Sequence, residues 1–492
     1  MELIWNEINA ERLVDSVTEQ AHISGELPVP EQRSIREIVS CSARTYIDGC
    51  RADNGEVTVS GNITALVTAL DDANEAFAFE SSAEFTHTAA CDKAFQGMRA
   101  EAVPVIQTLE AFPKGTFAEL KADIDLDIRV IDEIPIRTVA GVSGLADLEK
   151  RNGEAVVYKS SLVADETLRL REEISSEGFV KVVCSEGYVS VRDVSVDETT
   201  AAVSGSITVS AVTADEKNGL SRLVRQVPFR EKIPLRSIAS NAYCRPELVS
   251  IALRTLDEDP GLLLLEAEVR FMLYGTTVSN VSVMKDAFSP TVGFDCLYDD
   301  VLAMERRNAV TETLNIREEI PVRGLFDPSM KPVLASARAV LTDASAMNGG
   351  VRIGGVLVTD VLFMNETGGC YTEKADVPFE TIMENVSCIS RADVTADCAC
   401  SIAGVTAEGV LVQYSVSLAC DDVKLNEMRL MTGLAEREQK RAMTGLVVCF
   451  ASEGEEVYDI AKRYSVPCDS VRKLNPDQRE PFSEGEKLLL MM

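Results

Sequence analysis

The sequence repeats one pattern three times at domain-sized intervals, and this repeat constrains the fold more than any other feature. In each copy a glycine precedes a phenylalanine by 24 residues, and the pairs are Gly61 with Phe85, Gly205 with Phe229, and Gly355 with Phe379. Val-Pro stands directly before the phenylalanine in the second and third copies, where Pro228 and Pro378 are the prolines. A constant spacing of this kind predicts tandem copies of one structural unit.

The copies read as antiparallel β-structure. Each contains a long run in which apolar and polar residues alternate, at 117–130, 262–274 and 409–420. Alternation with period two is typical of half-buried strands. The glycine within its strand predicts a bulge or a close backbone approach, and the prolines predict a strand start or an edge strand. We expect the three phenylalanines to pack in the core, as large aromatic side chains usually do.

These patterns define the domain organisation that we expect for the 492 residues. The fold class is mostly β, of the α+β type, with three tandem antiparallel β-rich repeat domains and a small βααβ module at the end. The charged segments near 147–154 and 304–310 mark the joins. The predicted limits are 1–146, 147–295 and 296–428 for the repeats, 429–445 for a linker with some helical tendency, and 446–492 for the module.

Composition excludes several classes of function. The net charge is −31, from 48 Lys+Arg against 79 Asp+Glu, which disfavours binding to nucleic acid or to anionic lipid. No uninterrupted apolar run reaches the roughly 18 residues of a membrane span. The first residues lack the basic and apolar regions of a signal peptide, and the 13 cysteines form no disulfide-scaffold pattern. We therefore expect a cytoplasmic protein with reduced thiols.

The sequence offers no constellation for catalysis, and we predict no enzyme activity, cofactor or metal site. His22 and His87 are the only histidines, and His87 with nearby Cys91 falls short of a zinc ligand set. Cys398 and Cys400 would share one face of a strand, and we interpret them as apolar fillers rather than a redox pair. Neither a P-loop nor a nucleophile elbow is present.

The last 47 residues follow a different pattern. A short apolar strand leads to acidic residues at 453–456, which favour a helix start. Apolar residues then recur at helical spacing from Val457, and again from Cys468. Pro476 ends the second helix, and an apolar strand closes the chain. The order is strand–helix–helix–strand.

This tail resembles a LysM domain. The matching residues are Gly454-Glu455, Ile460-Ala461, Tyr464, Val466, Leu474-Asn475-Pro476 and Gly485-Glu486-Lys487-Leu488. Three acidic β-rich repeats followed by one LysM domain are similar to the SipL-like spore-coat morphogenetic proteins of clostridia, which are built from SPOCS domains. The segment 27–47 and the REEI sequences at 171–174 and 317–320 contribute to this likeness.

The resemblance implies a structural adaptor at the forespore surface, in the cytoplasm of the mother cell. It implies the coat ATPase SpoIVA and other coat proteins as partners. A second hypothesis is a LysM domain that binds peptidoglycan or other N-acetylglucosamine chains, with Tyr458 as its aromatic platform. In either case the resemblance places the binding groove between two loops, at Gly454, Glu455, Glu456, Val457, Tyr458, Asn475, Pro476 and Asp477.

Overall fold

The protein is mostly β, as the sequence predicts. The computed structural model describes residues 2–29, 33–73, 75–175, 181–214, 220–237, 239, 241–256, 262–307, 309–322, 329–365, 370–438 and 445–492. Within these ranges lie two α-helices, both in the tail, and a short 3-10 helix at Arg391–Asp393. None of the described helices is long and apolar enough to cross a membrane.

The first 143 residues contain six strands that pair in one antiparallel sheet. Their order across the sheet is β1-β6-β5-β2-β3-β4. The first and last strands of the group are the longest and pair along their whole length. The strands are β1 (Glu2–Pro28), β2 (Glu37–Asp53), β3 (Glu56–Leu70), β4 (Ala76–Ala90), β5 (Arg99–Pro113) and β6 (Phe117–Ser143).

The next six strands repeat these pairings in two smaller sheets. Their orders are β10-β9-β8 and β11-β12-β7, so the first and last strands of the group again pair. The strands are β7 (Glu149–Ser175), β8 (Lys181–Asp197), β9 (Thr200–Ala214), β10 (Leu220–Pro234), β11 (Asn241–Thr255) and β12 (Leu262–Phe288).

The third group has the same pairings, but both of its long strands are interrupted. The orders are β13-β20, β14-β19-β18 and β15-β16-β17. The strands are β13 (Phe294–Arg306), β14 (Val310–Pro321), β15 (Lys331–Met347), β16 (Gly350–Met364), β17 (Cys370–Glu384), β18 (Val394–Val405), β19 (Gly409–Cys420) and β20 (Val423–Glu436).

Cross-strand pairing explains the constant spacing between glycine and phenylalanine. Gly61 lies directly opposite Phe85, Gly205 opposite Phe229, and Gly355 opposite Phe379. The glycines leave room for the rings, because a Cβ on Gly355 would stand 2.5 Å from the Phe379 ring. A Cβ on Gly205 would also stand 2.1 Å from the backbone carbonyl oxygen of Ser190, so the expected close backbone approach is confirmed. The prolines lie in the middle of β10 and β17, which are edge strands, and edge strands are where a sheet tolerates proline.

The three groups also share the positions of their β-bulges. One strand of each group, β2, β8 or β15, shifts register twice, and a bulge increases local twist at a fixed point. The shifts lie at Ile38/Ser40 and Ile47/Gly49, at Val182/Cys184 and Val191/Asp193, and at Pro332/Leu334 and Leu341/Asp343.

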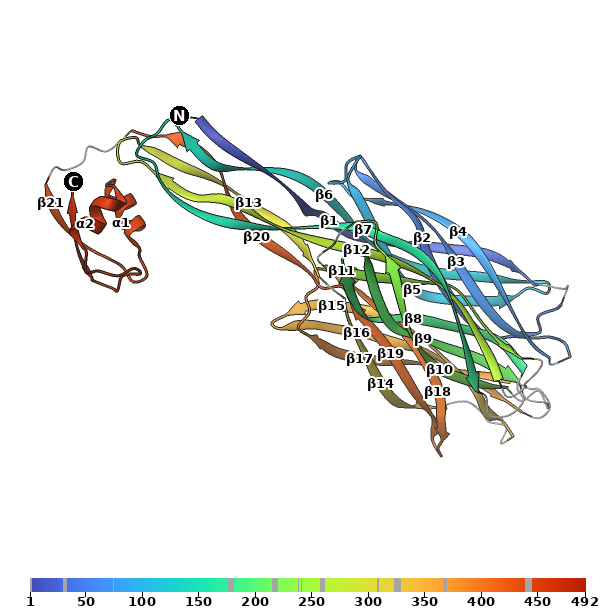
Figure 1. Ribbon diagram of the computed structural model, residues 1–492. Helices are drawn as coiled ribbons and strands as arrows, with labels where there is room; N and C mark the ends of the chain where they lie inside the picture. Colours follow the sequence, from blue (N-terminus) through green and yellow to red (C-terminus); the bar gives the residue numbers. More distant parts are fainter. Residues whose placement is uncertain are drawn as a thin grey trace.

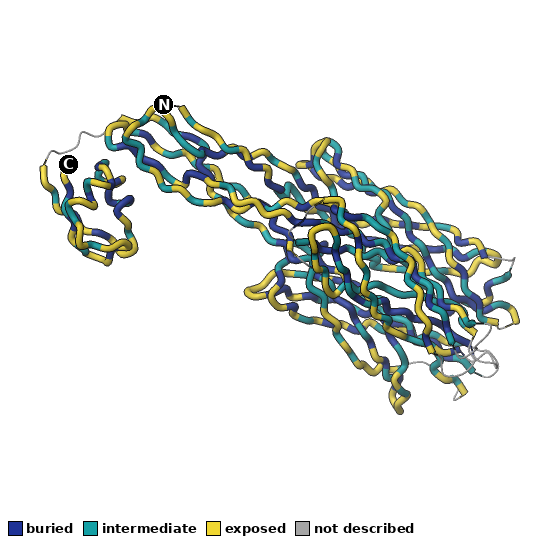
Figure 2. The backbone as a smooth tube through the Cα atoms, viewed as in Figure 1, coloured by how far each residue is buried: buried dark blue, intermediate teal, exposed yellow. Residues whose placement is uncertain are grey.

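The long strands extend from a wide body into a narrower stalk (Figure 1). We define the stalk as three strand pairs: 2–12 with 132–143, 149–161 with 275–288, and 294–306 with 423–436. Buried residues continue along its interior (Figure 2). The core of the stalk takes residues from all three pairs, namely Ile8, Ala10, Ile136, Ala155, Val157, Val283, Ala303 and Leu430.

Buried ion pairs connect the three groups within the body. Each pair joins strands or turns from two different groups, and several of the side chains are almost fully buried. The pairs are Arg129–Asp393 at 2.6 Å, Arg245–Asp421 at 2.8 Å and Arg306–Glu101 at 3.0 Å.

Three predicted boundaries need correction. Part of the predicted join at 147–154 is strand, since β7 begins at Glu149, and the limit at 295/296 falls within β13. The predicted linker 429–445 is strand as far as Glu436, while 439–444 lie outside the described residues. A register shift in this strand makes the neighbours Leu430 and Met431 both buried. This shift breaks the alternation that would have indicated a strand.

Candidate functional site

The tail forms a small unit with its own core. Its elements are β21 (Leu446–Phe450), α1 (Val457–Tyr464), α2 (Cys468–Leu474) and β22 (Lys487–Met491), with the two strands paired antiparallel. The Asp459 carboxylate accepts the backbone N–H of Glu456 at 3.0 Å and so caps the start of α1. Basic residues occupy the last turn, where they favour the helix dipole.

The first predicted groove loop, 454–458, is held by internal contacts. The Gly454 N–H donates to the Phe482 carbonyl at 2.9 Å, and the Phe482 N–H donates to the Glu455 carbonyl at 2.8 Å. The Glu455 side chain accepts the Ser452 N–H and pairs with Arg463. This loop therefore lies against the segment around Phe482.

The second predicted loop, 475–477, is anchored by Asn475. Its amide donates to the carbonyls of Val471 and Leu489, both at 2.8 Å, and its side-chain oxygen accepts the Leu489 N–H. Asn475 thus ties α2 to β22, which is a structural role. Pro476 and Asp477 are exposed. Among the described residues, no hydrogen bond or ion pair joins 454–458 to 475–477.

Tyr458 is covered by the stalk. Its ring meets Phe288 edge-on with 5.3 Å between centroids, and the Arg151 guanidinium lies 4.6 Å above it. Only 7% of Tyr458 is exposed. The predicted platform for a sugar is therefore not open in this structure.

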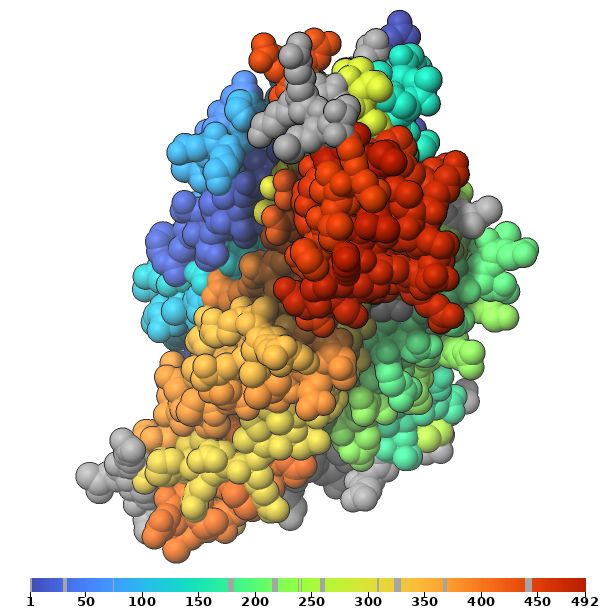
Figure 3. Space-filling view, turned by 90° about the vertical axis from the view of Figure 1, so that its left-hand side faces the viewer, coloured from blue at the N-terminus to red at the C-terminus, as the bar shows by residue number. Residues whose placement is uncertain are grey.

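The same end of the stalk makes polar contacts with both tail helices. Arg151 pairs with Glu456 and with Asp459, each at 3.0 Å. Lys462 on α1 pairs with Asp286 at 2.6 Å. The Glu149 carboxylate accepts the N–H of Cys468, the first residue of α2, at 3.1 Å. Figure 3 shows the tail seated on this end of the molecule.

An exposed apolar face lies on the tail sheet, and sequence reasoning missed it. Four side chains project from one face of β21 and β22: Leu446 is 61% exposed, Val448 44%, Phe450 62% and Met491 54%. The intervening Cys449 and Leu490 are buried in the tail core. The signal was present in LVVCF, since a strand that is apolar at every position is apolar on both faces.

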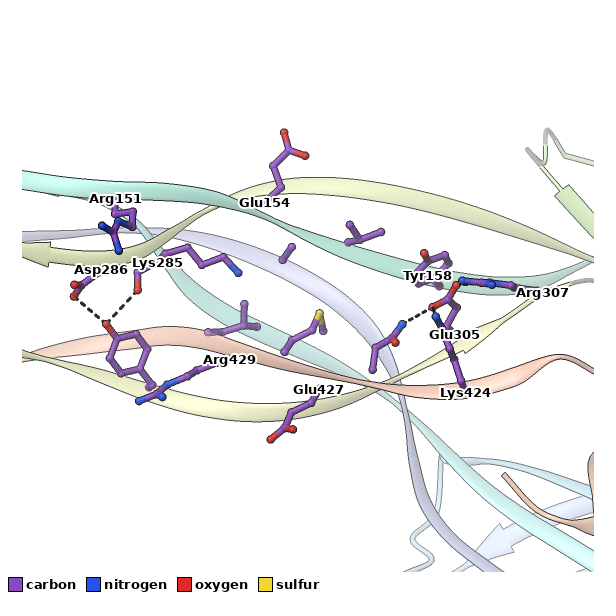
Figure 4. A pocket seen from close by; sticks show the side chains of 16 residues that line it. Arg151, Glu154, Tyr158, Lys285, Asp286, Glu305, Arg307, Lys424, Glu427 and Arg429 are labelled. Carbon is purple, nitrogen blue, oxygen red and sulfur yellow. Dashed lines mark hydrogen bonds and ion pairs between the residues drawn. The ribbon is translucent and has the colours of Figure 1, made fainter. Parts of the chain in front are cut away.

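A charged cleft of about 740 Å³ lies along the stalk beside the tail. Five cations and four carboxylates line it, from β7, β12, β13, β20 and, just after β13, Arg307. Figure 4 labels these side chains. Glu305 accepts from Arg307 at 2.7 Å and pairs with Lys424 at 3.2 Å. Because the two signs nearly balance, the cleft does not select a ligand by charge. It shares Arg151 and Asp286 with the tail contact.

The remaining histidine and cysteine candidates from the sequence do not come together in a site. His22 lies at the surface, 2.6 Å from Asp123. Cys398 and Cys400 pack in the core of the third group, and burial raises the pKa of Cys400 to about 11, which disfavours a reactive thiolate. In the part of the chain that the structure describes, no three His, Cys, Asp or Glu side chains are placed to hold a metal ion.

The fold and the tail together define the class of protein. It is a mostly-β protein that carries a small strand–helix–helix–strand unit at the end of a stalk of three strand pairs. No protein-family model, curated protein or solved structure matches the chain.

Proposed function

We propose that this protein is a non-enzymatic structural adaptor in spore-coat assembly. In this proposal three SPOCS-like repeats, ending with β6, β12 and β20, form the scaffold. A LysM-like tail at 446–492 binds the coat ATPase SpoIVA, and the scaffold contacts other coat proteins. The protein acts in the mother cell, at the forespore surface.

The shared geometry of the three groups supports a repeat scaffold. Each group has the same pairings, the same two bulges in β2, β8 or β15, and the same glycine opposite phenylalanine. Independent features at equivalent positions favour copies of one unit over three unrelated sheets.

The exposed apolar face of the tail carries the assignment of the partner class. Leu446, Val448 and Phe450 stand in a row on β21, beside Met491 on β22. In a chain with a net charge of −31, a contiguous apolar patch of this kind marks a protein-interaction surface. An exposed apolar sheet face suits an apolar surface on a folded partner, whereas sugar sites are concave with convergent polar groups.

The test compares binding of SpoIVA by the full chain and by the chain with Phe450→Ser. Because an exposed aromatic at the centre of an interface contributes strongly, we expect SpoIVA binding to weaken about tenfold or more. Arg479→Ser is the matched control, because Arg479 is exposed on the tail and is not one of the four residues that form this face. A chain that ends at 445 should fail to bind SpoIVA.

Two outcomes would contradict the adaptor proposal. One is SpoIVA binding that survives both Phe450→Ser and removal of the tail. The other is capture of purified peptidoglycan without any binding of SpoIVA, which would support the glycan alternative. In that case the groove around Tyr458 would have to open away from the stalk.

A further inference from the structure

We propose that the stalk tip and the tail form a reversible intramolecular latch that covers the Tyr458 face of the tail. The latch consists of Arg151, Asp286 and Phe288 on the stalk, with Glu456, Tyr458, Asp459 and Lys462 on the tail. It assigns a conformational role to contacts that the adaptor proposal does not use.

The contacts are complementary and come from two separate parts of the chain. Arg151 pairs with Glu456, which precedes α1, and with Asp459 on α1, and it also lies over the Tyr458 ring. On the other side Lys462 reaches Asp286, so the charges alternate across the interface. Phe288 joins the apolar core of the tail, and it is the only stalk residue among the buried members of that cluster. One aromatic anchor within a charged rim is a typical docking arrangement.

The Tyr458 hydroxyl indicates that the docked contact between tail and stalk is not as stable as it could be. Among the described residues it has no hydrogen-bond partner, although it is buried. Burial raises the pKa of Tyr458, and the charged neighbours that act on it, Asp286 and Arg151, belong to the stalk. In a released tail this hydroxyl would reach water. Burying it unpaired therefore opposes docking.

The ion pairs of the latch are also exposed enough to be weakened by salt. The side chain of Arg151 is 38% exposed, that of Glu456 51% and that of Lys462 43%. Ion pairs at such exposure contribute little each and are screened as ionic strength rises. The latch should thus open when salt is raised or when one anchor is removed.

The latch separates the two surfaces of the tail. In the docked state the apolar face of β21 is open while Tyr458 is covered. A protein partner can therefore bind the docked tail. A ligand that needs the Tyr458 face can bind only after the tail has been released from the stalk. The apparent affinity of such a ligand is its intrinsic affinity multiplied by the fraction of molecules with a released tail. Only this consequence rests on the proposed function. The latch itself has a readout that needs no partner.

The test uses the full chain and two chemical probes read by mass spectrometry. A carbodiimide should couple the Lys462 amine to the Asp286 carboxylate at low salt, because these groups lie 2.6 Å apart. Hydroxyl-radical labelling should spare Tyr458 relative to Tyr464, which is half-buried on the same helix. In 1 M NaCl, in Phe288→Ala or in Arg151→Ala, we expect the cross-link to fall about fivefold and labelling of Tyr458 to rise.

Arg472→Ala is the matched control. Among the described residues, the ion-pair partners of Arg472 are Asp469 and Glu480, both in the tail, so its loss should leave both readouts unchanged. The latch is overturned if Tyr458 is labelled as fast as Tyr464 in the unmodified chain. It is equally overturned if the cross-link and the protection persist in both stalk variants and at high salt, since the contact would then be permanent.

Discussion

At the residue scale, the glycine opposite each phenylalanine is a tightly constrained position. A Cβ on Gly205 would stand 2.1 Å from the Ser190 carbonyl oxygen and 2.9 Å from the Phe229 ring. We expect Gly205→Ala to destabilise the protein by about 1–3 kcal/mol, because backbone and ring must both shift. The midpoint of urea unfolding measures this. Gly404→Ala is the control, since a Cβ there meets nothing within 4 Å. Equal midpoints for the two variants would refute the argument.

The sequence predicted these residues well because the constraint is local. A cross-strand pair in a hairpin fixes the number of residues between its two members. The spacing between Gly205 and Phe229 therefore recurs between the equivalent glycine and phenylalanine of the other two copies. Phe450 could not be found in this way. Its exposure depends on which face of β21 the tail helices cover, and LVVCF is apolar on both faces.

At the element scale, the end of α1 is a strained position. Ser465 has φ 52° and ψ 47°, in the left-handed region, which a residue with a side chain adopts at a cost of roughly 1 kcal/mol. Ser465→Gly should therefore stabilise the tail by about 0.5–1 kcal/mol. Slower hydrogen exchange at the amides that close the helix would show it.

A serine-to-glycine substitution within α2 should instead destabilise the tail. Ser470 lies inside that helix, where glycine costs about 0.5–1 kcal/mol relative to better helix formers. If Ser470→Gly and Ser465→Gly both accelerated exchange, the left-handed end of α1 would not be a source of strain.

Strands and helices were predictable where their period was unbroken. The alternating runs that begin at 117, 262 and 409 are the starts of β6, β12 and β19. The tail order of strand, helix, helix and strand also followed from its apolar spacing. The end of β20 was missed because its bulge places Leu430 and Met431 in the core together.

At the scale of the whole molecule, the association of the three groups could not be read from the repeat. The contacts between groups depend on residues that differ from copy to copy, such as Arg129 with Asp393 and Arg245 with Asp421. A sequence repeat predicts the contacts that all copies have in common. These ion pairs are formed by residues that the copies do not have in common. The docking of the tail through Phe288 was hidden for the same reason.

The link between the first and third groups should make the protein sensitive to acid. Burial alone would raise the pKa of Glu101, but the Arg306 and Arg245 guanidiniums outweigh it and lower the pKa from 4.5 to about 2. Because the folded pKa lies below the unfolded one, this carboxylate stabilises the fold above pH 4.5. That contribution, up to about 3 kcal/mol, is lost as pH falls toward 2.

Glu101→Gln should therefore lower stability at pH 7 and flatten its decline between pH 4.5 and 2, as followed by urea unfolding at each pH. Arg306 would lose the carboxylate with which it forms an ion pair and keep its hydrogen bond to the Tyr243 hydroxyl, 2.6 Å away, and a less compensated buried cation is costly. Glu110→Gln removes an exposed carboxylate from the same strand and should leave the pH profile as it is. If the two variants had the same profile, the Arg306–Glu101 pair would not hold the first and third groups together.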